Sequence, residues 1–564
     1  MSRPLLILAA IFALLYAPFL GKALHIDDYY FFEVSKMVGW NPLDTEPSDL
    51  PYMGYLLEDT LPYELTHPLG VPYCIKIARA VLGEGEVGLR LAFLFFPLLA
   101  VVGMWRLQRA VLPNASAFPL ALLALFLAAP AFLVNSQTLM TDYPTLAFLL
   151  VGMAMLVAGI ESGRTRTLVL GSCSLSAAVL CSYQMAMFPV LVLFYAWIKK
   201  RLSARAVLFA ALPLAALAVW LLSVYLLHDL FPGLKSRVAE HGAGISGDIG
   251  RGIAPQALLR KLGTLLAGIG ASCALPLVLR IGRLGLRPIW IAVWAALTVA
   301  AWLGIRGSAH IFAMAGTEAH RTGALALFAV VGIFALVIAL RAHGSSIEPR
   351  KLLLLRLWIA GVVTYTILLM PFGATRYAMP ALAPMFLLLL EPVAGELRTR
   401  LATVVIALAV LVGLVHARSD YEMADAYRVI ADDVGELAPD RDVWYIGEWG
   451  MRYYMDAAGF HYLFRDAEPA VGDLVVIPTL CRFWMPPRET RPYLYLLELW
   501  EYAPPRHGSR LLPVRLFNRD ARAGFYGDWI GGLPFAFSNA PYETFGIFEV
   551  RAERRDGPIP LRKR

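Results

Sequence analysis

Residues 4–24 read PLLILAAIFALLYAPFLGKAL, and the stretch HIDDYY (residues 25–30) follows directly. This apolar run has about the 20 residues that an α-helix needs to cross a bilayer. Arg3 precedes the run and no small-residue cleavage site follows it, so we expect an uncleaved membrane anchor rather than a removable signal. The sequence thus predicts a spanning helix that ends at an acidic pair.

The composition of the whole chain agrees with a membrane protein. Of its 564 residues, 59% are hydrophobic and 16% are charged, whereas soluble domains have about 45–50% apolar and about 25% charged residues. Both differences argue against a soluble enzyme, and disordered chains are poor in apolar residues. The five cysteines include no CxxC pair, so they indicate neither a disulfide framework nor a zinc site.

Similar apolar runs recur along the chain and predict about thirteen membrane spans. They lie near residues 4–24, 87–106, 117–134, 143–160, 167–183, 185–198, 205–228, 259–280, 287–304, 323–341, 353–371, 376–393 and 400–416.

The short loops between the runs predict the orientation. Alternate loops carry clusters of Lys and Arg, as at 199–205 and 280–287, whereas 135–142 has none and 371–376 has one. Positive loops face the cytoplasm, so we expect a cytoplasmic N-terminus and, after an odd number of spans, an extracytoplasmic C-terminal region. The net charge of +8 is then mostly a topology signal, which argues against nucleic acid as a partner.

The sequence predicts two domains. Residues 1–416 form a transmembrane module whose first extracytoplasmic loop covers 25–86, and 417–564 form a small extracytoplasmic α/β domain. Within that domain we expect helices at 421–437 and 449–458 and strands at 442–446, 472–478 and 545–550. A glycine-rich segment, 229–256, is either a functional lid or a plain connector.

Five polar residues fall on the predicted outer side: Asp27, Asp28, His67, Asp142 and Arg376. Each has an ordinary structural explanation when taken alone. The acidic pair could mark a helix end, the THPLG stretch at 66–70 could be a turn before a helix, the third aspartate could cap the following span, and the arginine could snorkel to the interface. Together they offer carboxylates, an imidazole and a guanidinium on one side of the membrane, which favours a site where an anionic donor meets an activated hydroxyl.

The order of these residues resembles a known family. It comprises the acidic pair in DDYY (27–30), HPL (67–69), GEGEVGLRL (83–91), TD (141–142) and RYAMP (376–380). This order is similar to that of the GT-C membrane glycosyltransferases of the dolichyl-phosphate-mannose–protein mannosyltransferase type, which include the bacterial aminoarabinose transferases. The resemblance is clearest over residues 5–200 and implies a mainly α GT-C helix bundle, with the α/β domain at its C-terminus.

The resemblance also implies roles for individual residues. The first acidic residue after span one is the base in such enzymes, which corresponds to Asp27; the second acidic position corresponds to Asp28, and the carboxylate that opens span four to Asp142. Many relatives have Lys-Pro-Pro or His-Pro-Pro where this chain has HPL, so His67 would face the donor phosphate. Arg376 could bind the same phosphate bidentately.

The implied function is transfer of a sugar from a polyprenyl-phosphate donor to a hydroxyl of an envelope lipid, glycan or protein, at the outer face of a bacterial inner membrane. A single base with backside attack predicts inversion at the anomeric carbon, whereas a retaining, two-step route would require a nucleophilic carboxylate close to that carbon, a role from which only geometry could exclude Asp28. The sequence neither requires nor excludes a bound divalent metal ion, since no residue spacing demands one. The alternatives are a transporter or flippase of lipid-linked sugars, whose polar groups usually lie near the midplane, and a family relative without catalysis.

Overall fold

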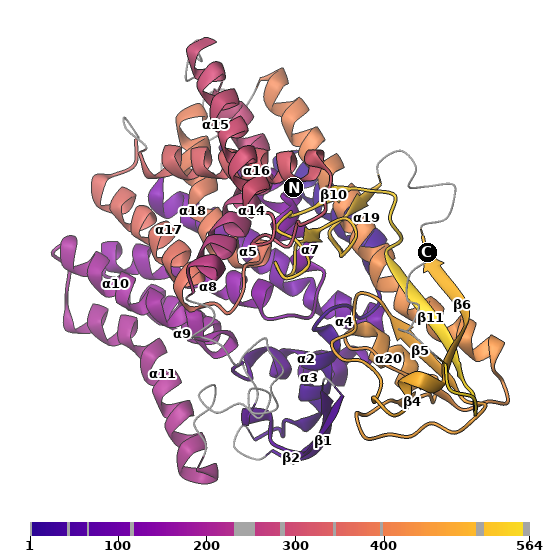
Figure 1. Cartoon of the computed structure of the whole chain (residues 1–564). Coiled ribbons are helices and arrows are strands. Elements are labelled where there is room, and N and C mark those ends of the chain that lie inside the picture. The colour runs from indigo at the N-terminus through magenta and orange to yellow at the C-terminus, as the bar shows by residue number, and fades with distance from the viewer. Residues whose placement is uncertain are drawn as a thin grey trace.

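The structure is a computed structural model, and its description covers residues 3–41, 45–52, 54–64, 67–112, 118–229, 254–281, 288–341, 346–394, 399–503 and 513–555. It combines a large helical bundle with a C-terminal region that contains a β-sheet (Figure 1). The predicted fold class, a mainly α helix bundle with a small α/β region at its C-terminus, is confirmed.

Each of the apolar runs in the sequence coincides, in its described part, with one helix or with consecutive helices. Within the described part of the chain, seven segments are long and apolar enough to cross a membrane, and four shorter apolar helices accompany them. The helices of the bundle are α1 (Arg3–Tyr16), α4 (Glu86–Phe93), α5 (Phe95–Val111), α6 (Phe118–Ala128), α7 (Pro130–Ser136), α8 (Asp142–Ser162), α9 (Thr165–Cys181), α10 (Met187–Ile198), α11 (Ala204–His228), α14 (Pro255–Ile281), α15 (Pro288–Gly307), α16 (Ala319–Leu340), α17 (Pro349–Leu369), α18 (Met379–Leu390) and α19 (Arg400–Leu437).

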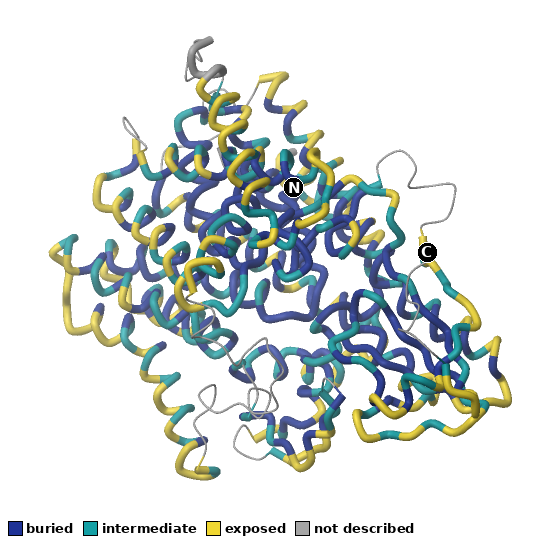
Figure 2. The backbone as a smooth tube through the Cα atoms, viewed as in Figure 1, coloured by how far each residue is buried: buried dark blue, intermediate teal, exposed yellow. Residues whose placement is uncertain are grey.

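Burial separates the centre of the bundle from its periphery. The described residues of α7 and α18 are buried throughout, whereas α11 exposes an apolar surface on which Leu226 is 71% accessible (Figure 2). An exposed apolar helix is stable only when another apolar medium covers it. The outer helices are therefore suited to contact lipid.

Small residues let the two helices α14 and α16 approach each other closely. A Cβ atom on Gly270 would lie 1.9 Å from the carbonyl oxygen of Phe328, and one on Gly332 would lie 1.9 Å from that of Leu266. Larger side chains at either glycine would push the backbones apart. Such close contacts are typical of helix pairs in membranes, where van der Waals packing and hydrogen bonds replace the hydrophobic effect between helices.

The C-terminal region contains a five-stranded sheet of order β4-β3-β5-β11-β6. Its strands are β3 (Val443–Tyr445), β4 (His461–Tyr462), β5 (Leu474–Pro478), β6 (Leu494–Tyr502) and β11 (Glu543–Val550), and α20 (Gly450–Ala457) connects β3 to β4. β3 runs parallel to β4 and β5, whereas β11 is antiparallel to β5 and β6. Three of these strands and α20 match the predicted elements; β4 and β6 were not predicted.

One difference from the expected layout concerns α19. The sequence predicts a span at 400–416 and a separate amphipathic helix at 421–437, but a single helix covers Arg400–Leu437. No proline or glycine interrupts the intervening HARSD stretch, so nothing in it breaks the hydrogen-bond ladder. The helix therefore leads directly from the bundle into the C-terminal region, and the boundary at residue 416 stays a prediction.

The first predicted loop, 25–86, has structure of its own. It contains α2 (Asp28–Met37), the hairpin β1 (Ser48–Tyr52) and β2 (Tyr55–Thr60), and α3 (Gly70–Leu82). The hairpin lies beside the C-terminal region (Figure 1). At its tip, Gly54 accepts a hydrogen bond from the backbone N–H of Arg465 (3.0 Å) and donates one to the hydroxyl of Tyr462 (2.9 Å).

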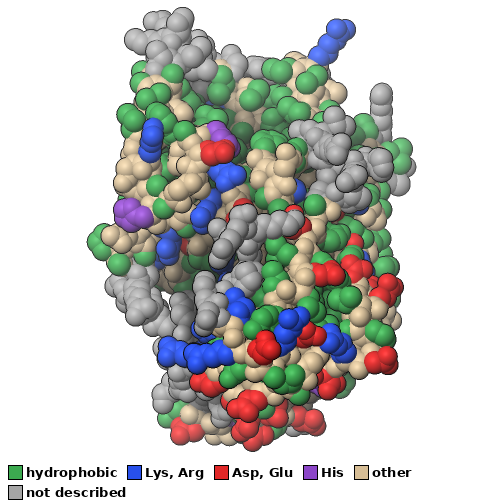
Figure 3. Space-filling model, turned by 45° about the vertical axis from the view of Figure 1, so that its right-hand side comes forward, with side chains coloured by type: hydrophobic (Ala, Val, Ile, Leu, Met, Phe, Trp, Pro, Cys, Tyr) green, Lys and Arg blue, Asp and Glu red, His purple; other side chains and the backbone are tan. Residues whose placement is uncertain are grey.

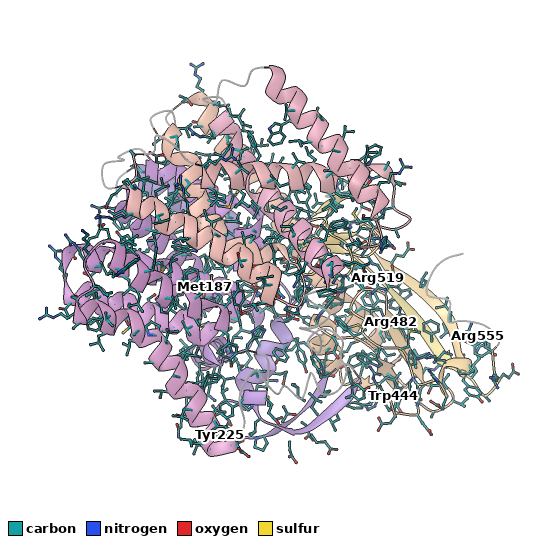
Figure 4. All side chains as sticks on the ribbon, turned by 60° about the vertical axis from the view of Figure 1, so that its left-hand side comes forward. Met187, Tyr225, Trp444, Arg482, Arg519 and Arg555 are labelled. Atoms are coloured by element: carbon teal, nitrogen blue, oxygen red, sulfur yellow. The ribbon has the colours of Figure 1, made fainter. Side chains whose placement is uncertain are left out.

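The two regions also differ in the side chains on their surfaces. In Figure 3 acidic side chains gather toward the lower end, where the C-terminal region lies, and hydrophobic side chains are frequent toward the upper end. Figure 4 places Met187 among the bundle helices and Trp444, Arg482 and Arg519 in the C-terminal region. The predicted lid or connector at 229–256 falls, apart from its ends, outside the described residues.

A buried charged cluster joins α19 to the end of the first span. Asp420 forms an ion pair with Lys22 and accepts hydrogen bonds of 2.9 Å from Tyr526, and its Oδ1 lies 3.3 Å from Nε2 of His25. The side chains of Asp420, Lys22 and His25 are inaccessible to solvent. A buried charge is tolerated only when it is paired and hydrogen-bonded, so this cluster connects two segments that lie far apart in the sequence.

Replacing Asp420 by alanine should therefore destabilise the protein strongly. The ammonium of Lys22 would stay buried without its counter-ion, which costs about 3–5 kcal/mol in comparable buried pairs. Thermal unfolding of the purified protein in detergent would measure the loss. Asp432→Ala, at an exposed position of the same helix, should change stability by less than about 0.5 kcal/mol, and equal effects of the two variants would contradict the prediction.

Candidate active site

Three of the five predicted site residues meet around one guanidinium group. Nη2 of Arg376 lies 3.7 Å from Oδ2 of Asp27, and Nη1 lies 3.4 Å from Oδ2 of Asp142. The arginine therefore faces two carboxylates that lie more than one hundred residues apart in the sequence. Both contacts are longer than an optimal charge-assisted hydrogen bond of about 2.7–2.9 Å. The two carboxylates therefore attract the guanidinium by their charge, but neither forms a short hydrogen bond with it.

The backbone in front of Asp27 is strained. Ile26 has φ = +48°, which is rare for a β-branched residue, and its side chain is buried. Such a conformation costs about 1–3 kcal/mol and persists only where the surroundings enforce it. The chain then enters α2, where the carbonyl of Asp27 accepts a hydrogen bond from Phe31 (3.2 Å). The strained turn thus sets the direction of the Asp27 side chain.

Arg376 lies on the short 3-10 helix η4 (Thr375–Ala378), which directly precedes α18. Its side chain is 8% accessible, and its Nε is buried without a hydrogen-bond partner among the described residues. The guanidinium also lies 5.3 Å from the ring centre of Tyr377. An arginine side chain stays protonated in proteins, so the site contains a permanent cation, and one of its N–H groups has no acceptor among the described residues.

Asp28, the second member of the acidic pair, is fully buried and forms its ion pair with Arg90. Its Oδ2 accepts hydrogen bonds from Arg90 (2.7 Å) and from the backbone of His25 (3.1 Å), and its Oδ1 accepts one from the backbone of Leu139 (2.6 Å). Adjacent positions therefore have different surroundings. Asp28 ties α2 to α4 and to the segment that leads into α8, whereas Asp27 faces the guanidinium.

His67 lies between the first-loop hairpin and α3, and its ring centre is 5.5 Å from that of Phe31. Burial lowers its pKa to about 4, and of the two charged groups that act on it, Asp142 raises the pKa and Arg376 lowers it. The imidazole is therefore neutral near pH 7 and can donate one N–H, but it supplies no positive charge before an anion binds.

The surroundings of Asp27 raise the pKa of its carboxyl. Partial burial is the main cause, since the Asp27 side chain keeps 40% of its accessible surface; Arg376 opposes the rise, and the charges of Asp142 and Asp28 add to it. A carboxylate with a raised pKa takes up a proton more readily, which suits a general base.

As the base of a transfer reaction, Asp27 should make the rate fall in acid, at a pH above the ordinary pKa of an aspartate of about 3.9. Only the ionised form of Asp27 accepts a proton, so activity is present above its raised pKa and is lost below it. The pH–rate profile at saturating donor measures this. Because His67 also titrates in acid, the profile of His67→Gln separates the two groups; disappearance of the acid limb in that variant would contradict the assignment to Asp27.

The described residues contain no group of three or more His, Cys, Asp or Glu side chains that could hold a metal ion. Asp27 and Asp142, the carboxylates that a cation would use, both face Arg376. This arrangement fits an ion pair better than a set of metal ligands.

Other residues that build the site were not assigned in the sequence. Arg90 lies inside the GEGEVGLRL stretch, where a charge within an apolar helix could have indicated a buried partner. Glu86 of the same stretch accepts a hydrogen bond from Tyr454 of the C-terminal region (2.8 Å), and Tyr454 in turn accepts one from the backbone of Leu24 (2.9 Å). No local pattern could have predicted this second connection, since its partners lie more than 350 residues apart.

Comparisons with known proteins agree with the resemblance seen in the sequence. Residues 66–228 match the family model described as dolichyl-phosphate-mannose-protein mannosyltransferase. No curated protein matches the sequence.

Several solved structures are similar. ArnT from Cupriavidus metallidurans bound to undecaprenyl phosphate has 15% identity and a TM-score of 0.43, with coverage of 88% of this chain and 96% of that chain. AglB from Archaeoglobus fulgidus, in complex with an inhibitory peptide and a dolichol-phosphate, has 14% identity and a TM-score of 0.44, with coverage of 81% and 63%. The arabinosyltransferase EmbB from Mycobacterium smegmatis has 15% identity and a TM-score of 0.30, with coverage of 92% and 47%.

Residues 66–228 are thus similar to a family of mannosyltransferases, and helices of the described chain are long and apolar enough to cross a membrane. The matched segment, 66–228, contains His67 and Asp142 of the candidate site. The resemblance to GT-C transferases that the sequence indicated is confirmed.

Proposed function

We propose that this protein transfers a sugar from a polyprenyl-phosphate-linked donor to a hydroxyl group of an envelope lipid, glycan or protein. The observation that carries the proposal is the arrangement of Arg376 between Asp27 and Asp142, with one buried N–H for which the described residues supply no acceptor. A phosphate at this position would supply the missing acceptor and a negative charge. Asp27, the proposed base, lies within ion-pair distance of the guanidinium of Arg376.

The roles of the side chains follow from the chemistry of the reaction. A glycosyl phosphate already has a good leaving group, so the departing phosphate needs stabilisation of its charge rather than a general acid. Arg376 would provide that charge, and the neutral His67 an additional N–H. As the acceptor oxygen bonds to the anomeric carbon and the bond to the phosphate oxygen breaks, Asp27 would take the hydroxyl proton. One such displacement inverts the configuration at that carbon.

Asp28 and Asp142 complete the proposed site. Asp142 would keep Arg376 oriented while adding negative charge near the acceptor hydroxyl. Asp28 would act through the turn that presents Asp27, because Arg90 and two backbone amides already occupy its oxygens.

The polar groups lie at helix ends and in loops, namely in the turn before α2, at the start of α8 and in η4. A transporter of lipid-linked sugars would more typically place its polar groups near the midplane of the membrane on broken helices. The location of these residues therefore favours a transferase.

We further propose that the site and the C-terminal region face the outside of a bacterial inner membrane. The clusters of Lys and Arg in alternate loops support this orientation. A reporter fused after Arg564 should then be active only outside the cytoplasm, and a second reporter placed in the basic loop at 199–205 should be active only inside. The reverse result for the pair would contradict the orientation.

The function can be tested without knowing the sugar. Mass spectrometry of envelope lipids and glycans should show a glycosylated species in cells with the gene and its unmodified acceptor in cells without it. Purified protein in liposomes should then form the same species from a lipid extract of the deleted strain. Movement of the donor across the bilayer without product formation would instead support a transporter.

A further inference from the structure

A short segment of the C-terminal region contacts the loop that carries Arg376. The carbonyl of Phe525 accepts a hydrogen bond from the backbone N–H of Thr375 (3.0 Å). The backbone N–H of Asp528 donates to the carbonyl of Gly373 (2.9 Å), and the carboxylate of Asp528 accepts from the N–H of Gly373 (2.8 Å). Three hydrogen bonds therefore fix the residues that immediately precede Arg376.

Asp528 is well suited to hold this loop. It is inaccessible to solvent, and Nε of Arg260 on α14 lies 3.2 Å from the same oxygen that binds Gly373. A buried carboxylate is costly unless charge and hydrogen bonds compensate it, so its position is strongly restricted. The loop fits closely, because a Cβ atom on Gly373 would lie 2.8 Å from Oδ2 of Asp528 and 3.1 Å from the Cα of Lys261.

The same segment contacts the turn that carries Asp27. The hydroxyl of Tyr526 donates to Asp420 at 2.9 Å, and Asp420 pairs with Lys22 and His25 just before that turn. The ring of Tyr526 also packs edge-on against the ring of His25, with 5.5 Å between the ring centres. Residues 525–528 thus contact both sides of the candidate site.

We propose that Asp528, with its neighbours Phe525 and Tyr526, is a positioning residue that holds Arg376 in the orientation needed to bind the donor phosphate opposite Asp27. This inference rests on the proposed function. It gives the C-terminal region a role in building the donor site as well as any part that it has in recognising the acceptor. Preorganisation of this kind improves binding because the loop is ordered before the ligand arrives.

Binding of undecaprenyl phosphate to the purified protein in nanodiscs tests the proposal without a known sugar or acceptor. Asp528→Ala should weaken binding by about tenfold, comparable to the loss of about one charge-assisted hydrogen bond. Asp528→Asn should stay within about threefold of the wild type, because its amide oxygen still accepts from Gly373. Asp466→Asn, at an exposed position of the same region, is the matched control and should bind as the wild type does.

A double-mutant cycle distinguishes positioning from general destabilisation. If Asp528 acts through Arg376, the variant with both Asp528→Ala and Arg376→Ala should bind no more weakly than Arg376→Ala alone. Independent losses that multiply would overturn the proposal, as would wild-type binding by Asp528→Ala. A normal affinity in Arg376→Ala would instead refute the phosphate role of that arginine, so the two failures are distinguishable.

Two further measurements cover the case in which Asp528→Ala does not fold. Gly373→Ala perturbs the same contact from the other side and should weaken binding in the same way. Hydrogen–deuterium exchange over residues 370–378 should be faster in this variant than in the wild type and unchanged in Asp528→Asn. Unchanged exchange and binding in Gly373→Ala would overturn the proposal.

Discussion

Asp27→Asn should lower glycosyl transfer by about 10²–10⁴-fold, the range that a positioned general base contributes. Asparagine keeps the shape of the side chain but cannot take the proton of the acceptor hydroxyl. Donor binding should change little or become tighter, because a negative charge beside Arg376 is removed. The rate of transfer at saturating donor and the affinity for undecaprenyl phosphate, measured on the same preparation, separate these effects.

Asp59→Asn is the matched control for this variant. Asp59 is exposed on the hairpin of the same first loop, and its φ of +49° is one that asparagine adopts readily. The control should retain the wild-type rate. Full activity of Asp27→Asn would remove Asp27 as the base and would leave Asp142 as the remaining carboxylate beside Arg376.

Arg376→Ala should weaken donor binding by about 10–100-fold, since a hydrogen bond to a charged group contributes about 1.5–3 kcal/mol. The affinity for the acceptor should change much less, because the arginine is proposed to face the phosphate. Removing the cation also leaves Asp27 and Asp142 without their shared partner, so Asp27 should become harder to ionise and the acid limb of the pH–rate profile should move to higher pH. Kinetics at varied donor and varied acceptor concentrations measure both effects.

Two variants help to interpret the result. Arg376→Lys retains a positive charge but loses the planar fork of the guanidinium, so it should recover only part of the affinity. Arg554→Ala, at an exposed position near the end of the described C-terminal region, should bind the donor normally. Equal dependence on donor concentration in Arg376→Ala and the wild type would refute the phosphate role.

Much of the fold could be predicted because membrane helices are encoded locally. A run of about 20 apolar residues must satisfy its backbone hydrogen bonds internally, and a helix does so within the segment. The predicted runs therefore coincide with helices. The single helix over Arg400–Leu437 was predicted as two because its composition changes from apolar to amphipathic near residue 416, although its backbone continues without a break.

The strands of the C-terminal region could be predicted only in part. β5 is a continuous apolar run at 474–478 and is buried throughout, so its sequence indicates a central strand. β4 has two residues, His461 and Tyr462, and its assignment depends on pairing with β3. The LYLLELWEY run of β6, residues 494–502, is compatible with either a helix or a strand until β11 lies beside it.

In the candidate site, too, the sequence indicates which residues are candidates, but their contacts depend on segments that lie far apart in the chain. The five residues stand out in the sequence because ionisable groups are rare near one face of a membrane protein, where burying them costs free energy unless they are functional or paired. Sequence alone could not tell Asp27 from Asp28 by their surroundings, and only the packing of Arg90 and Leu139 against one of them does so. The sequence also assigns His67 to the donor phosphate, but only the packing around it shows that burial lowers the pKa of its imidazole to about 4.

The sequence by itself determined that this chain is a multi-pass membrane protein, where its helices lie and which polar residues are candidates for chemistry. Hydrophobicity and helical hydrogen bonding act over neighbouring residues, so these properties can be read from short segments. Only the tertiary structure decided that Arg376 lies between Asp27 and Asp142 and that residues 525–528 brace its loop. Those contacts join segments that lie far apart in the sequence. Their energies depend on burial, which exists only once the chain has folded.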